Sequence, residues 1–119
     1  MAKSLNRWTA IGNLVADPET RATTGDTTVT NIRVAVNDSY NKRDGTKVES
    51  TLYMRVVCFG KLSDLVAQYL QKGAKIYIEG RVTENKWQDK DGNDRYTTEV
   101  VADNIQFLDA PKPRGDDPF

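Results

Sequence analysis

The segment at residues 51–61, TLYMRVVCFGK, alternates between two kinds of side chain. On a β-strand, successive side chains point to opposite faces, so one face of this segment is apolar and the other carries two rings with a cation between them. The apolar set is Leu52, Met54, Val56 and Cys58, and the opposite set is Tyr53, Arg55, Val57 and Phe59. An exposed face of this kind suits a polyanion whose bases stack on the rings, and it is equally compatible with a sugar or RNA.

A second aromatic candidate, Trp87, ends another alternating segment. From residue 75 onward, apolar positions alternate with a polar set that includes Trp87. We expect the indole at the mouth of a hairpin loop, beside Lys86 and near Lys90 and Arg95, where it suits a base with neighbouring phosphates. The alternative is a tryptophan that covers the end of a barrel.

Arg33 and Tyr40 complete the residues that suggest binding. Arg33 alternates with apolar neighbours and is expected beside Arg55, where two like charges repel unless an anion or a carboxylate such as Glu79 shares them. Tyr40 lies in a predicted loop at residues 38–50 and is a second-rank candidate for stacking.

The sequence offers little for catalysis, and we predict no catalytic residue, metal site or cofactor. The chain has no histidine, which excludes histidine-based triads and imidazole metal ligands. Its single cysteine, Cys58, falls in an apolar alternation and is expected in the core. The acidic residues of DKDGND at residues 89–94 are normal turn formers, and a calcium loop that began at Asp89 would need a glutamate where Val100 stands.

Composition bounds the class of protein. The 119 residues suffice for one domain, and 17 basic against 17 acidic residues give a net charge of zero. Any nucleic-acid site must therefore be a local patch rather than a basic field. The N-terminal segment lacks the apolar stretch of a signal peptide and no apolar run approaches membrane-span length, so we expect a cytoplasmic protein without a membrane association.

Turn residues divide the chain into extended stretches and one helix. Strands are predicted at residues 7–14, 28–37, 51–59, 75–86 and 96–107, with turn chemistry at residues 16–26 and hairpin loops around Asp44-Gly45 and Asp91-Gly92. Residues 61–70 instead show helical spacing of Leu62, Leu65, Val66, Tyr69 and Leu70.

The order of three strands, a helix and two strands predicts an all-β protein, specifically the five-stranded Greek-key barrel called the OB-fold, with its helix between strands three and four. This fold binds oligonucleotides or oligosaccharides on the face of strands two and three, so residues 51–59 fall on a binding strand. We expect one domain over residues 1–108. The proline-rich residues 109–119 are predicted to form a disordered acidic tail.

The chain resembles the bacterial single-stranded DNA-binding protein family over nearly its whole length. The matching strings are IGNL at 11–14, ADPE at 16–19, RVVCFGKL at 55–62, YLQKG at 69–73, IYIEGRV at 76–82, KWQDKDGNDRYTTEVVAD at 86–103 and the terminal DDPF. The resemblance implies a nucleoid-associated homotetramer that wraps and protects single-stranded DNA in replication, recombination and repair.

The resemblance also implies roles for individual residues. Its base-stacking aromatics correspond to Tyr40, Tyr53, Phe59 and Trp87. Its phosphate-contacting cations correspond to Arg7, Arg21, Arg55, Lys61, Lys72, Lys86 and Arg95. Arg33 is added to this set from its expected place beside Arg55, not from the resemblance. Two positions that are often basic in the family hold Thr83 and Asn85 here.

The C-terminal tip departs furthest from the family. A linker of about six residues replaces the usual long one, and the tip is Asp116, Asp117, Pro118 and Phe119 without a preceding aliphatic residue. A terminal ring beside carboxylates suits a hydrophobic pocket rimmed by basic residues on replication and repair proteins. The alternatives to DNA binding are an OB-fold module for RNA or oligosaccharide, and an oligomeric interaction protein that has lost DNA binding.

Overall fold

The computed structural model describes residues 4–23, 25 and 27–109. Among them it contains six strands and one helix. In chain order these are β1 (Trp8–Leu14), β2 (Glu19–Ala22), β3 (Thr28–Asn41), β4 (Lys47–Phe59), α1 (Gly60–Tyr69), β5 (Lys75–Gln88) and β6 (Asp94–Phe107). No helix in this part of the chain is long and apolar enough to cross a membrane.

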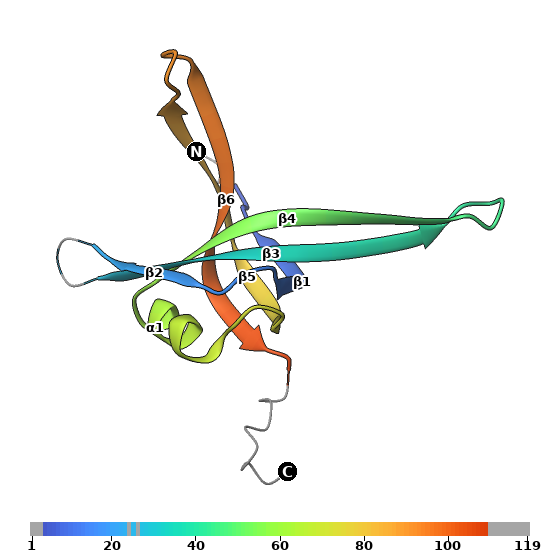
Figure 1. Ribbon diagram of the computed structural model, residues 1–119, viewed down its shortest axis with the longest axis horizontal. Coiled ribbons are helices and arrows are strands. Elements are labelled where there is room, and N and C mark those ends of the chain that lie inside the picture. Colours follow the sequence, from blue (N-terminus) through green and yellow to red (C-terminus); the bar gives the residue numbers. More distant parts are fainter. Residues whose placement is uncertain (1–3, 24, 26, 110–119) are drawn as a thin grey trace, which may run out of the picture.

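Five of the strands close into a barrel. The sheet order is β1, β5, β6, β4, β3 and β2, and a further pairing between β1 and β3 closes the ring. All neighbours are antiparallel except β4 and β6, which pair in parallel. The helix joins β4 to β5, the third and fourth strands of the barrel (Figure 1). The prediction of an OB-fold barrel is confirmed.

The strands differ from the prediction in length and number. The segment predicted as turn contains β2, whose four residues pair with residues 28–31 although none of them is apolar except Ala22. Most of the predicted loop at residues 38–50 is strand, because the ladder between β3 and β4 continues to Asn41 opposite Lys47. The turn between them is stabilised by Asp44 Oδ1, which accepts the Thr46 N–H at 2.9 Å. Tyr40 therefore lies on β3, opposite Val48, and not in a loop.

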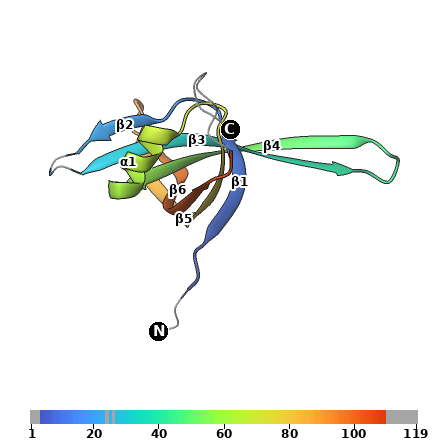
Figure 2. The same cartoon turned by 90° about the horizontal axis from the view of Figure 1, so that it is seen from below.

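The long hairpins carry side chains away from the barrel. The hairpins β3–β4 and β5–β6 extend beyond the barrel as two arms in different directions (Figure 1). Figure 2 shows the β3–β4 arm on the opposite side of the molecule from α1 and β2. Leu52, predicted to face the core, is half-exposed because its part of β4 already belongs to the arm. The ends of both hairpins are therefore largely exposed.

The core follows the predicted alternation inside the barrel. Val34, Val56, Ile76, Ile78 and Val100 are fully buried, and Val66 joins them from the helix. Cys58 is buried as predicted, and burial raises the pKa of its thiol to about 12. A buried contact of 2.6 Å between the Thr30 and Ser63 hydroxyls connects β3 to α1.

Val57 is the exception on the outer face of β4. It was predicted to lie exposed between Arg55 and Phe59, yet it is buried. At this position β4 pairs on both sides, with Asn31 of β3 and Val101 of β6, so neighbouring side chains cover it. The outer face is open only on either side of Val57.

Candidate nucleic-acid interface

The outer face of β4 presents the aromatic and cationic side chains that the alternation predicted. Tyr53 and Phe59 keep 55% and 48% of their surface exposed, whereas aromatic side chains are usually largely buried. Arg55 lies between them and is also exposed. Alternation in a strand accounts for this arrangement, since residues two apart share a face.

Arg33 lies directly across the ladder from Arg55, as predicted. Its guanidinium carbon sits 5.6 Å from the centre of the Tyr53 ring, a cation–π arrangement on a ring that stays more than half exposed. The carboxylate that pairs with this cluster is not Glu79, which accepts the Tyr77 hydroxyl at 2.7 Å. It is Glu99 of β6, whose Oε2 lies 3.7 Å from Arg55 Nε.

These residues border an open groove of about 490 Å³. The groove brings the start of β2 and the segment before it together with β3, β4 and β6. Its lining consists of Ala16, Asp17, Glu19, Asn31, Ile32, Arg33, Tyr53, Arg55 and Thr98. Both cations of the Arg33–Arg55 pair and the Tyr53 ring therefore face one hollow, which can accept a planar ring together with an anion.

A cross-strand row extends this face toward β2. Arg21 pairs with Val29, and Val29 pairs with Phe59, so the three side chains share one face of the sheet. Lys61 follows in the first turn of α1, two residues after Phe59. Beyond the buried Val57, the exposed Phe59 ring thus shares its sheet face with Arg21, and Lys61 is close to it in the sequence.

Trp87 forms the corresponding feature on the β5–β6 arm. It is 50% exposed, and its Nε1–H donates to Thr97 Oγ1 at 2.9 Å. Arg95 is its direct partner in the ladder and shares its face. Lys86 does not: as the adjacent residue it lies on the opposite face, where its Nζ is 3.3 Å from Asp94 Oδ2.

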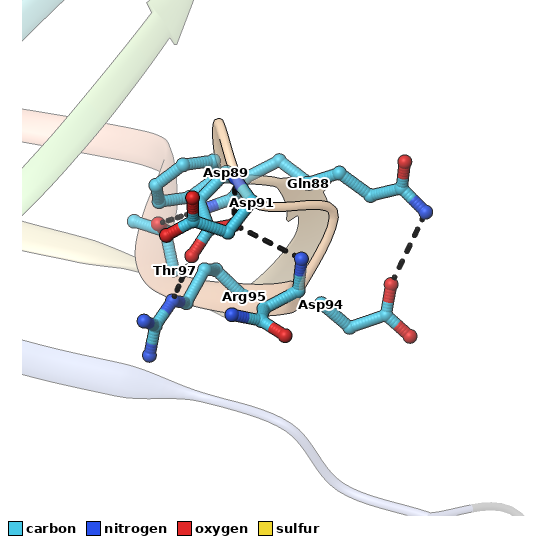
Figure 3. A network of polar contacts seen from close by, with 8 residues as sticks. Gln88, Asp89, Asp91, Asp94, Arg95 and Thr97 are labelled. Atoms are coloured by element: carbon cyan, nitrogen blue, oxygen red, sulfur yellow. Dashed lines mark hydrogen bonds and ion pairs between the residues drawn. The ribbon is translucent and has the colours of Figure 1, made fainter.

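The turn beside Trp87 is held by Asp89. Its Oδ1 accepts the N–H groups of Asp91 and Asn93 at 3.0 and 2.9 Å, and its Oδ2 accepts Arg95 Nε at 2.9 Å (Figure 3). These bonds, above all that from Asn93, lower the pKa of Asp89. Asp89 therefore acts as a turn former. The described ranges contain no group of three or more histidine, cysteine, aspartate or glutamate side chains that could hold a metal ion.

The remaining predicted cations, Arg7 and Lys72, are not among the residues that line the groove. Arg7 comes just before β1, which pairs with β5 and β3 rather than with β4. Lys72 lies in the turn after α1, where its backbone N–H donates to Asp17 Oδ1 at 2.8 Å. Both are exposed. The predicted tip, residues 116–119, lies outside the described residues.

Two further residues of β6 were not predicted as candidates. Tyr96 is 59% exposed and faces away from Trp87, paired with Lys86 on the other side of the hairpin. The alternation of YTTEVVAD could have revealed it. No pattern in the sequence indicated a role for Glu99, because its contact with Arg55 depends on the parallel register between β4 and β6.

A closed five-stranded barrel with aromatic and cationic side chains along two arms defines the class of oligonucleotide-binding barrels. Within that class the chain belongs to the single-strand binding protein family, whose model matches residues 5–108. This membership confirms the prediction of a non-enzymatic, single-stranded DNA-binding protein.

Individual relatives agree with this assignment. Single-stranded DNA-binding protein 1 of Xylella fastidiosa strain 9a5c is 44% identical over 106 residues, which cover 88% of this chain and 78% of that protein. A single-stranded DNA-binding protein of strain Temecula1 is 41% identical over 108 residues, which cover 91% of this chain and 66% of that protein.

Solved structures match the fold over nearly all of the chain. A Plasmodium falciparum SSB in complex with single-stranded DNA superposes with a TM-score of 0.85 and 26% identity, covering 92% of this chain and 99% of that one. A deletion mutant of the single-stranded DNA binding protein from Thermus aquaticus gives a TM-score of 0.79 and 32% identity, covering 97% of this chain and 54% of that one.

Proposed function

We propose that this protein binds single-stranded DNA with little sequence preference along the outer face of β4 and the Trp87 face of the β5–β6 arm. Bases stack on Tyr53, Phe59 and Trp87. Tyr40 lies on the other face of the β3–β4 arm, because it is an odd number of residues from Ala35, the ladder partner of Tyr53, so it adds a stack only if the DNA strand passes around the arm. The observation that carries this proposal is the arrangement around Tyr53, an exposed ring beside two facing arginines in one groove. The similarity to an SSB whose structure was solved with single-stranded DNA supports it.

The energetics fit a protein without net charge. Each stacked base contributes about 1 to 3 kcal/mol, so a few stacks outweigh the weak long-range attraction of a neutral chain. Cations beside the rings meet the phosphates: Arg21, Arg33, Arg55, Lys61 and Arg95 lie on the proposed path, while Arg7, Lys72 and Lys86 join it only if the strand continues around the barrel and the arms.

Titration of labelled oligo-dT with the protein at several salt concentrations tests the proposal by fluorescence anisotropy. We expect saturable binding whose log Kd rises with log salt by roughly 0.7 per phosphate neutralised. Oligo-rU and a chito-oligosaccharide serve as competitors. Absence of binding at low salt, or displacement of the DNA by the sugar at similar concentration, would contradict the proposal.

We further propose that the chain works as a cytoplasmic, nucleoid-associated homotetramer in replication, recombination and repair. The support is family membership alone. Light scattering with and without a long oligonucleotide measures the assembly, and a monomer under both conditions would overturn this part of the proposal.

The division into a binding domain at residues 1–108 and a tail at residues 109–119 is also a proposal, in which Asp116, Asp117, Pro118 and Phe119 recruit replication and repair proteins. Removal of these last four residues should leave oligo-dT binding intact while reducing the retention of such proteins from a lysate. Equal retention by both forms would contradict a role for the tip.

A further inference from the structure

Glu99 occupies an unusual place for a carboxylate on a surface that binds a polyanion. Its side chain is only 12% exposed, on the outer face of β6 between the two arms. Oε2 lies 3.7 Å from Arg55 Nε, and Oε1 accepts Asn85 Nδ2 at 2.5 Å. The carboxylate is thus held from both sides and cannot swing away into solvent without losing these partners.

The same carboxylate neutralises one member of the Arg33–Arg55 pair. The two arginines are directly opposite in the ladder, so without an anion they repel each other. Arg33 lies over the Tyr53 ring, and Arg55 is engaged through Nε by Glu99. The Arg55 side chain is 51% exposed and lines the groove together with Arg33.

We propose that Glu99 is the internal counter-ion of a phosphate subsite formed by Arg33 and Arg55, and that its charge weakens DNA binding at this subsite. The inference depends on the proposed function and specifies how the affinity of that site is set. A phosphate between the two guanidiniums gains both cations but is repelled by the fixed carboxylate behind Arg55. Asp17 and Glu19 also line the groove, so the subsite is balanced between charges rather than strongly basic.

The substitution Glu99→Gln removes the charge and keeps an oxygen that can accept the Asn85 N–H. Asp103→Asn is the matched control, since Asp103 also lies on β6 and pairs with an arginine, Arg81, at 3.5 Å. At low salt we expect Glu99→Gln to bind oligo-dT roughly fivefold more tightly, the scale of one partly exposed ion pair. Asp103→Asn should change the Kd by less than about twofold.

The tighter binding of oligo-dT by Glu99→Gln must depend on Arg55. In an Arg55→Ala background, Glu99→Gln should no longer tighten binding, because the cation that the carboxylate neutralised is gone. As an independent measurement, Arg33→Ala, at an exposed position that should tolerate the change, is expected to reduce the salt slope by roughly 0.7, the value for one phosphate. Urea unfolding of each variant verifies that it is folded.

The possible results distinguish a failure of the proposed role of Glu99 from a failure of the proposed DNA binding. A wild-type protein that fails to bind oligo-dT overturns both. If the wild type binds but Glu99→Gln weakens binding as Arg55→Ala does, Glu99 positions Arg55 and the inference is wrong. It is also wrong if Glu99→Gln has no effect, if both neutralised carboxylates tighten binding equally, or if the gain persists without Arg55.

Discussion

Trp87 on β5 donates its indole N–H to the hydroxyl of Thr97 on β6 at 2.9 Å, across the hairpin that carries both residues. The bond fixes the orientation of a ring that is half-exposed at the end of an arm. A ring held in this way loses little conformational freedom when a base stacks on it. The relationship indicates that the arm presents Trp87 rather than burying it over the end of the barrel.

Replacement of Trp87 by alanine should weaken binding of oligo-dT by about 1 to 3 kcal/mol, the contribution of one stacked base. Thr97→Val, which removes the acceptor but keeps the ring, should weaken it by less than about 1 kcal/mol. Anisotropy titration with labelled oligo-dT measures both. Tyr69→Ala, which removes an exposed ring from α1, is the control and should leave the Kd unchanged. Equal losses at Trp87 and Tyr69 would show that stacking on the arm is not specific.

Alternation in the sequence was sufficient to predict the buried face of the barrel portions of β3, β4 and β5, apart from the buried Val57 on the outer face. It placed Arg33 beside Arg55 and left Tyr53 and Phe59 exposed, because period-two patterning is strict where one face is a core. The same rule, applied to adjacent residues, would have separated Lys86 from Trp87. Their proximity in the sequence was mistaken for a shared face.

The strands and contacts that could not be predicted from the sequence are formed by strand pairing that buries no apolar face. Beyond the barrel, residues 38–50 are polar apart from Tyr40 and Val48, so no apolar period marks them as strand. The ladder hydrogen bonds and the Asp44 turn stabilise them instead. All four residues of β2 are exposed, so no apolar alternation in the sequence indicates this strand either. Glu99 reaches Arg55 only through the β4–β6 register, which is a property of the closed barrel.

The turn at Asp89 should depend on pH. Hydrogen bonds lower the pKa of Asp89 in the folded protein below its ordinary value of 3.8. Above pH 3.8 the ionised carboxylate therefore stabilises the turn. This stabilisation is lost as the pH falls through the pKa of the folded protein. Hydrogen exchange of the Asp91 and Asn93 amides, followed by NMR from about pH 6 to about pH 2.5, should show protection, relative to intrinsic rates, falling in the acid range. Asp89→Asn, which can accept the same amides without titrating, should lack this fall, and an identical profile in both proteins would contradict the assignment.

Cys58 should be chemically inert in the folded protein. Burial raises the pKa of its thiol to about 12, so at pH 8 only about one molecule in ten thousand carries the reactive thiolate. We expect no release of thionitrobenzoate from Ellman's reagent by the native protein over minutes, and release of one equivalent per chain in urea. Rapid reaction without denaturant would show that the barrel opens around β4.

The contact between the Thr30 and Ser63 hydroxyls should contribute measurably to the free energy of unfolding. Both side chains are fully buried, their oxygens lie 2.6 Å apart, and Thr30 Oγ1 also lies 2.8 Å from Thr20 Oγ1. Thr30→Val leaves the Ser63 hydroxyl without this partner in the interior and should cost about 1 to 3 kcal/mol.

Ser63→Ala should cost less, because Thr30 keeps Thr20 as a partner, and the double variant should cost less than the sum of the two. Urea denaturation at one protein concentration measures all three proteins. Thr28→Val is the matched control, since it removes a hydroxyl that also connects β3 to α1, through Asp64 at 2.9 Å, but at a partly exposed position. Its effect should stay within about 0.5 kcal/mol. Strict additivity of the two buried substitutions would mean that α1 is held on the barrel by its apolar side chains, with no energetic coupling between the hydroxyls.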